Sequence, residues 1–323
     1  MKAVRVHQPG DASVLTVDEV PEPKAGPGEL LFDVEATGVN FIEIYQREGL
    51  YPMERPYIVG AEAGGTVRAI GAGVTDFRVG DRVVTERARG AYAERTTVAA
   101  EHAVRVPNGI AMDSAVALWL QGLTAHYLAT STYPLTHESP CLIHAAAGGV
   151  GLLFCQIAGK RGAHVIGTAG SDEKCDLARR AGARAAINYR THDFAAEVRR
   201  LTAGRGLDVV FDSVGASTYE KSIDCLAPRG MLVLFGQSSG KVPPIDPLLL
   251  NRKGSLYLTR PTLAHYVATR DELLGRARDL FDWVQDGSLD VRIGARFSLG
   301  DAAAAHRALQ ARETTGKVIL APG

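Results

Sequence analysis

The sequence predicts an α/β fold with a doubly wound parallel sheet, accompanied by a second, mostly β domain. Three observations carry this prediction. A glycine-rich run at residues 144–151 lies between a short apolar strand and an apolar helix. Short β-branched runs then alternate with helical patterns as far as residue 235. The first 120 residues instead alternate short β runs with turns rich in glycine and proline.

The glycine-rich run has the small residues of a dinucleotide-binding turn. Cys141–Ile143 is the strand before it, and a helix is expected from near Leu152. Ala146, Gly148 and Gly151 occupy the three small-residue positions. The first permits a tight turn, the second lets a pyrophosphate approach the backbone, and the third lets the helix pack on the strand. The phosphates would then meet unpaired amides at the helix N-terminus.

Strands and helices continue to alternate after this turn, as in a Rossmann domain with helices on both faces of the sheet. We expect strands at 164–168, 185–189, 207–211 and 231–235, and helices at 172–181, 194–202 and 219–226. An α/β fold without a nucleotide is the alternative. The glycines favour the nucleotide because they lie at the phosphate end of the first strand.

The end of the second strand bears on the choice between NAD and NADP. An NAD-selective domain places Asp or Glu there to bind the ribose 2′-hydroxyl. Thr168, Ala169 and Gly170 stand at that end instead, and none is acidic. Ser171 is expected to cap the next helix, with Lys174 in the first turn. Helix amides and an ammonium group suit a 2′-phosphate.

Other residues near that strand end include some that favour a 2′-phosphate and some that oppose it. Tyr189, which ends the third expected strand, can reach the phosphate with its hydroxyl. Asp172 and Glu173 would repel a phosphate, although the helix dipole favours carboxylates in a first turn whatever the ligand. Lys174 alone would also fit a solvated helix lysine. Together with the missing acid, these features lead us to expect NADPH.

The rest of the chain is expected to form the second domain. Its β runs are 29–35, 64–70, 81–85 and 92–98. The chain end would return to complete it with helices at 271–286 and 302–311 and strands near 296–298 and at 317–320. The expected domains are residues 1–124 completed by 261–323, and residues 125–260. A cleft between them would hold the nicotinamide.

Composition excludes several other classes of protein. Lys+Arg and Asp+Glu are both 36, which offers no broad field for nucleic acid or an anionic membrane. No apolar stretch is long enough to span a bilayer, and the first residues do not begin a signal peptide. The four cysteines fall on expected strands and helices without close pairing. Free thiols and a cytoplasmic location are therefore expected.

Linked motifs along the whole chain resemble a known family. Residues 60–67, 71–74 and 79–83 are similar to the medium-chain dehydrogenase/reductase pattern. The chain resembles the NADPH:quinone oxidoreductase branch, which includes ζ-crystallin, at residues 144–151, 188–190, 212–215, 235–240 and 254–261. The resemblance implies a GroES-like catalytic domain, a Rossmann cofactor domain and a homodimer or tetramer. In this family the strand corresponding to 255–259 commonly pairs across the subunit interface.

The resemblance also bears on zinc. Zinc alcohol dehydrogenases of this superfamily use a Cys, a His followed by Glu, and a second Cys. Asn40, Ala61 and Gln121 stand at the corresponding ligand positions, and only Glu62 is retained. Because a catalytic zinc needs three protein ligands, we expect no metal. The expected acceptor is then one that is already electrophilic, a quinone or an activated C=C bond.

Candidate substrate residues lie in and just after segment 38–45. Asn40, Tyr45 and Tyr51 can donate hydrogen bonds to a carbonyl oxygen that gains negative charge, although packing alone would also explain the two tyrosines. By resemblance, Gln121 and Thr124 begin a helix that faces the nicotinamide. The cofactor contacts implied by the resemblance are Phe41, Ile42 and Tyr127 on the nicotinamide side, Gly149 and Val150 at the pyrophosphate, Gly170, Lys174, Tyr189 and Arg312 around the 2′-phosphate, and Phe235, Gly236, Gln237 and Ser238 after a strand end.

The expected function is NADPH-dependent quinone reduction. An NADPH-dependent enone or alkenal reductase is the first alternative, because it shares the same hydride chemistry. A non-catalytic NADPH-binding protein, with a crystallin-like or an RNA-binding role, is the second. The balanced charge gives RNA binding no support.

Overall fold

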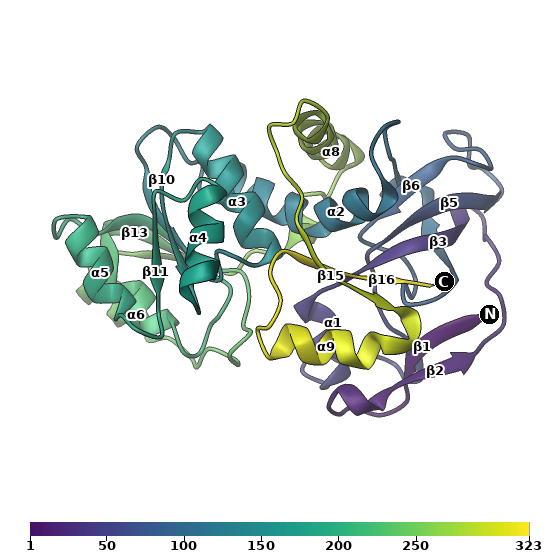
Figure 1. Cartoon of the computed structure of the whole chain (residues 1–323), viewed down its shortest axis with the longest axis horizontal. Coiled ribbons are helices and arrows are strands. Elements are labelled where there is room, and N and C mark those ends of the chain that lie inside the picture. The colour runs from purple at the N-terminus through teal and green to yellow at the C-terminus, as the bar shows by residue number, and fades with distance from the viewer. Residues whose placement is uncertain (323) are drawn as a thin grey trace. The chain divides into compact units, whose positions relative to one another are not determined.

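The computed structural model describes residues 1–322 and divides the chain into two compact units (Figure 1). Unit 1 holds residues 1–121 together with the chain from 269 onward, and unit 2 holds Gly122–Ala268. Residues 261–268 fall in unit 2, where Tyr266 stacks on Tyr127 with ring centroids 4.2 Å apart.

Unit 2 is built on one parallel sheet with strand order β11-β10-β9-β12-β13-β14. Its strands are β9 (Pro140–Ile143), β10 (His164–Ala169), β11 (Ala185–Asn188), β12 (Leu207–Asp212), β13 (Leu226–Leu234) and β14 (Tyr257–Thr259). Its helices are α3 (Gly149–Lys160), α4 (Asp172–Arg180), α5 (Phe194–Leu201), α6 (Tyr219–Asp224) and α7 (Pro247–Arg252). Helix α3 packs with α4, and α5 with α6, so that helices cover both faces (Figure 1). The doubly wound parallel sheet is confirmed.

The strand order reverses between β9 and β12, whose carboxyl ends therefore flank the switch point where open α/β sheets bind ligands. Apolar side chains from neighbouring strands and the helices above them fill the core. Among them are Leu142 of β9, Val210 of β12 and Val198 of α5.

Unit 1 is mostly antiparallel, as expected. A small sheet has the order β2-β1-β4, and a larger one the order β15-β16-β3-β5-β6-β8, with β7 also paired to β3. Only β15 and β16 are parallel among these pairs. The strands are β1 (Lys2–Val6), β2 (Leu15–Glu19), β3 (Glu29–Val39), β4 (Tyr57–Ile58), β5 (Ala63–Ile70), β6 (Arg82–Thr85), β7 (Arg95–Ala99), β8 (Val104–Arg105), β15 (Ile293–Ser298) and β16 (Lys317–Ala321). Strand β16, yellow in Figure 1, pairs with the purple β3 and so joins the chain end to the first part of the sequence.

Helices α1 (Phe41–Arg47), α2 (Met112–Tyr127), α8 (Arg270–Gln285) and α9 (Ala302–Gln310) complete the main elements, and α2 continues from unit 1 into unit 2. Short helical turns lie at Ala12–Val14, Ala100–His102, Leu128–Thr132, Leu263–His265 and Leu299–Asp301. Within residues 1–322, no helix has the length and apolarity to cross a membrane. All four cysteines are buried and free, as expected.

Three expected boundaries were wrong. Helix α3 begins at Gly149 rather than near Leu152, because the glycine run itself forms its first turn. Gln121 and Thr124 do not begin a helix, since α2 already starts at Met112. Strand β14 is shorter than 255–259, because Ser255 has φ 57°, which is outside the extended region.

Candidate functional site

The turn between β9 and α3 leaves no room for a side chain at Gly151. Gly148 is the N-cap residue of α3. A Cβ added at Gly151 would lie 2.4 Å from the carbonyl oxygen of Ala145 and 2.6 Å from the Cα of Ala146. The first turn of α3 therefore packs directly on the preceding loop, while residues 148–150 remain partly exposed. Exposed amides at a helix start fit the pyrophosphate of a dinucleotide.

A second cradle lies where β10 and β11 end. A Cβ at Gly170 would lie 2.7 Å from the hydroxyl oxygen of Tyr189. Ser171 caps α4 as expected, because its Oγ accepts the Lys174 N–H at 3.3 Å. Gly170, Ser171 and Tyr189 thus gather with the first turn of α4, and the end of β10 carries no acid. The position suits a 2′-phosphate.

Two neighbours of this cradle were not assigned a role from the sequence. Asn188 Nδ2 donates to Asp172 Oδ1 at 2.9 Å, which gives that carboxylate a partner. The Nε of Arg190 lies 3.7 Å from the Cβ position of Gly170, so a guanidinium also faces the cradle. The sequence signal that could have identified Arg190 is its position directly after Tyr189, at the end of a strand.

The loops after β12 and β13 approach each other closely at the same edge. A Cβ at Gly236 would lie 2.5 Å from the carbonyl oxygen of Ser213. Arg260 Nη1 donates to the carbonyl oxygens of Leu234, at 2.7 Å, and Gly236, at 3.1 Å. Residues 235–238 are partly exposed and follow the carboxyl end of β13, where a ligand of the sheet would lie.

A buried polar cluster supports this edge. His144 Nδ1 lies 2.8 Å from Thr168 Oγ1, and its Nε2 lies 3.0 Å from Ser222 Oγ, which in turn donates to Asp212 Oδ2 at 2.9 Å. No sequence pattern groups these residues, which come from the turn after β9 and from β10, β12 and α6. The carboxylate binds the serine rather than the second imidazole nitrogen, and all four side chains are buried. The order differs from that of a nucleophilic triad, so the cluster holds strands together. Burial lowers the pKa of His144 and keeps it neutral.

The remaining cofactor candidates lie on several elements. In unit 2, Thr124 and Tyr127 lie near the end of α2, where both are buried. In unit 1, Arg312 is exposed just after α9 and has φ 60°.

Helix α1 and the loop after it carry the aromatic substrate candidates of unit 1. The ring of Tyr45 lies 6.1 Å from that of Phe41 and 5.5 Å from that of Tyr51, which it meets edge-on. Tyr51 N also donates to the Tyr45 carbonyl at 3.1 Å. All three aromatic side chains are partly exposed, and Ile42 is exposed beside them. The structure thus brings these residues together.

Asn40, which precedes α1, belongs to a buried ionic cluster that the sequence did not reveal. Lys317 Nζ donates to Glu62 Oε2 at 2.5 Å and to Asn40 Oδ1 at 2.7 Å. Asn40 Nδ2 donates to the same Glu62 oxygen at 2.9 Å. The other oxygen, Glu62 Oε1, accepts the backbone N–H of Leu120 at 2.8 Å. Lys317 lies 255 residues from Glu62, so no local pattern could have joined them.

Two of the candidate or neighbouring residues have a buried oxygen without a hydrogen-bond partner among residues 1–322. These oxygens are Glu43 Oε1 and Gln121 Oε1. The second Glu43 oxygen accepts the Asn40 N–H at 2.7 Å. Burial raises the pKa of Glu43 to about 8, against the attraction of Lys317. Glu43 is therefore mostly protonated near neutral pH, and Lys317 and Glu62 compensate each other.

The positions that would hold a catalytic zinc do not fit the metal. Ala61 has no donor atom, and Glu62 has one oxygen on an ammonium and the other on a backbone amide. Across residues 1–322, no group of three or more His, Cys, Asp or Glu side chains lies together as a metal site. The ammonium group of Lys317 therefore lies beside Glu62, the one acid of the zinc pattern that is retained.

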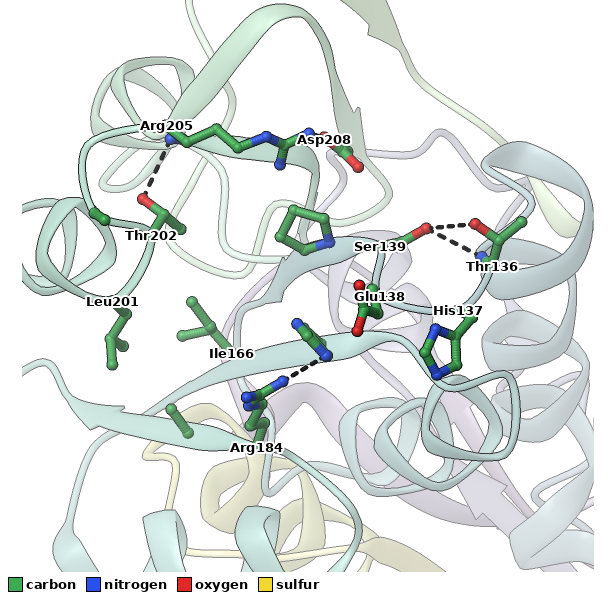
Figure 2. Close-up of a pocket in the computed structure, with 15 residues that line it drawn as sticks. Thr136, His137, Glu138, Ser139, Ile166, Arg184, Leu201, Thr202, Arg205 and Asp208 are labelled. Atoms are coloured by element: carbon green, nitrogen blue, oxygen red, sulfur yellow. Dashed lines mark hydrogen bonds and ion pairs between the residues drawn. The ribbon is translucent and has the colours of Figure 1, made fainter.

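Figure 2 shows a pocket of about 730 Å³ at the opposite edge of the unit 2 sheet. Pro140, His164 and Ala185, the first residues of β9, β10 and β11, line it. Its cations have partners, since Arg184 contacts His164 and Arg205 pairs with Asp208 at 2.8 Å. Because open parallel sheets bind ligands at the carboxyl ends of their strands, this pocket is not the cofactor site.

Two family models match the chain. The model described as alcohol dehydrogenase GroES-like domain matches residues 26–131, and the one described as zinc-binding dehydrogenase matches residues 149–273. The expected GroES-like fold is thereby confirmed.

Full-length relatives agree with these matches. The chain is 45% identical to a quinone oxidoreductase of Pseudomonas aeruginosa, with 97% of each chain covered. It is 41% identical to a 2-haloacrylate reductase of Burkholderia sp., covering 99% of this chain and 98% of that protein. A solved structure of the Escherichia coli quinone oxidoreductase complexed with NADPH matches with a TM-score of 0.97 at 40% identity, with 100% of both chains covered. The chain belongs to the quinone oxidoreductase family of the medium-chain dehydrogenases/reductases.

Proposed function

We propose that this protein reduces quinones with NADPH by a hydride transfer that uses no metal ion. The cradle at the ends of β10 and β11 carries the proposal, because Ser171, Lys174 and Tyr189 gather there and no acid ends β10. The relatives named quinone oxidoreductase, at 40–45% identity, support the acceptor.

The chain's own residues would hold the cofactor at the carboxyl edge of unit 2. Amides of Gly149 and Val150, at the start of α3, suit the pyrophosphate. Lys174 and Tyr189 would bind the 2′-phosphate by charge and by hydrogen bonding. The loop from Phe235 through Gly236 and Gln237 to Ser238 would line the remaining strand end. When bound, NADPH supplies the hydride.

Residues before and along α1 would receive the acceptor. A quinone that accepts a hydride becomes a hydroquinone anion, and hydrogen-bond donors stabilise the negative oxygen. Asn40, Tyr45 and Tyr51 are the proposed donors. The proposed residues of the nicotinamide side are Phe41, Ile42, Gln121, Thr124 and Tyr127. Exclusion of water by the bound acceptor would strengthen these bonds.

Reduction of an activated C=C bond is a second candidate function. A relative 41% identical to this chain is named 2-haloacrylate reductase. An α,β-unsaturated acceptor also carries a carbonyl oxygen, which the same donors would polarise. The two acceptors therefore share one site and differ in the electrophilic atom.

We also propose a cytoplasmic homodimer joined along β14. This strand is the edge of the parallel sheet. Tyr257 is 58% and Leu258 37% exposed there, and an apolar edge strand readily pairs with a second copy. Buried free thiols suit a reducing compartment.

The test is NADPH oxidation, followed by absorbance with 1,4-benzoquinone as acceptor and repeated with NADH. We expect quinone-dependent turnover that favours NADPH and persists after treatment with a zinc chelator. Turnover with 2-chloroacrylate but with no quinone would replace the first function by the second. Turnover lost on chelation and restored by zinc would refute the metal-free reaction.

A further inference from the structure

The polar centre of unit 1 is an ion pair that solvent does not reach. Lys317 is 1% exposed, Glu62 is 0% exposed, and their charged atoms lie 2.5 Å apart. Burying such a pair is costly, and apolar side chains of similar volume are often at least as stabilising. Stability alone therefore gives little reason to place these charges here, and the groups that they contact indicate their use.

The pair fixes the orientation of the Asn40 amide. Lys317 Nζ, which can only donate, lies 2.7 Å from Asn40 Oδ1. Ionised Glu62, which can only accept, takes Asn40 Nδ2 at 2.9 Å. Rotating the amide by a half-turn would place Nδ2 against the Lys317 ammonium, donor against donor. It would also place Oδ1 against the Glu62 carboxylate, acceptor against acceptor. The second Nδ2 hydrogen makes only a long bond, to the Gly38 carbonyl at 3.4 Å, and an acceptor oxygen would have to replace that weak bond.

The backbone at Gly38 leaves the space that the Glu62–Lys317 ion pair occupies. A Cβ at Gly38 would lie 1.9 Å from Glu62 Oε2 and 2.8 Å from Lys317 Cε, so the ion pair occupies the place of a side chain. Asn40 is the N-cap residue directly before α1, and its N–H donates to Glu43. Any shift of the pair would move the Asn40 amide and the start of the helix that carries Tyr45.

We propose that Lys317 is a positioning residue for quinone reduction, acting with Glu62 as an internal ion pair that orients the Asn40 amide. This inference rests on the proposed function, because it requires Asn40 to face the acceptor. Lys317 acts through Asn40 and does not itself touch the substrate. Glu62 compensates its charge and supplies the second contact to the amide.

The test combines Lys317→Met, Glu62→Gln and the double variant with an exposed-lysine control in the same unit, Lys2→Met. We expect Lys317→Met to lower kcat by about 10- to 100-fold, the usual effect of removing a partner behind an active-site group. KM for NADPH should stay within about twofold, because the proposed phosphate contacts of α3 and α4 lie in unit 2. The double variant should regain thermal stability lost in the single variants, since it buries no lone charge, but not kcat. Lys2→Met should retain wild-type kcat.

Recovery of both stability and kcat in the double variant would overturn the proposal, because the pair would then be structural only. Wild-type kcat in folded Lys317→Met would do the same. If no variant folds, NMR of the ¹⁵N-lysine-labelled wild-type protein decides, since a Lys317 ammonium held by Glu62 and Asn40 should exchange its protons slowly. Absence of any protected ammonium signal would refute the arrangement. Absence of wild-type turnover with every acceptor would instead refute the proposed function, which the NMR result does not depend on.

Discussion

Replacing Gly151 by alanine tests whether close packing of α3 on the glycine turn builds the cofactor site. The new Cβ would lie 2.4–2.7 Å from three backbone atoms of Ala145 and Ala146, whereas ordinary contact begins near 3.4 Å. The turn would have to retreat by roughly 1 Å, because these atoms are not the flexible end of a side chain. Overpacking of this kind costs about 2 kcal/mol.

The same helix supplies a matched control. Alanine at Gly159 would meet its nearest neighbour, the Gly182 carbonyl oxygen, at 3.8 Å. Gly159→Ala should therefore stabilise the helix by about 0.5–1 kcal/mol.

Thermal unfolding and NADPH binding measure both effects. We expect Gly151→Ala to lower Tm by about 4–8 °C and Gly159→Ala to raise it by about 2 °C. Displacing one amide from a phosphate loses about 1.5 kcal/mol, so Gly151→Ala should weaken NADPH binding by about tenfold, while Gly159→Ala leaves it unchanged. Equal Tm and equal NADPH affinity for Gly151→Ala and the wild type would refute the reasoning.

Three further predictions follow from other parts of the molecule. Lys174→Ala should weaken NADPH binding by about tenfold and leave NADH binding nearly unchanged, and equal losses by titration would exclude a 2′-phosphate contact. Burial raises the pKa of Glu43 from 4.5 to about 8, so between these values the unfolded carboxyl ionises while the folded one stays protonated. The stability that this group contributes is therefore lost as pH rises across that window, by up to about 1.4 kcal/mol per pH unit. Glu43→Gln lacks this loss, so in urea melts it should gain stability relative to the wild type from about pH 5 to pH 8. If the difference in unfolding free energy between Glu43→Gln and the wild type did not change from about pH 5 to pH 8, the raised pKa would be contradicted. Leu258→Lys should convert the proposed dimer to monomer in analytical ultracentrifugation, whereas Lys at the exposed Leu274 of α8 should not; a dimeric Leu258→Lys would exclude the β14 interface.

The parallel sheet and its glycine turn were predictable from the sequence because their signals are local. Each strand of unit 2 is a short apolar run, and each following helix has its own cap and periodicity, as Ser171 before α4 shows. Helix α2 gave a weaker signal. Its residues 115–119 are all buried, so no polar face marks the helical period and its start at Met112 was missed.

The candidate site likewise has a part that was predictable from the sequence and a part that was not. The cradle at Gly170 was predictable from the chain alone, because the missing acid, the helix cap and Tyr189 all follow from residues at neighbouring strand ends. Only the tertiary structure brought Lys317 to Glu62 and Asn40, and His144 to Ser222 and Asp212. Such contacts join residues far apart in the chain, and a buried charge acquires its partner only when distant strands are paired.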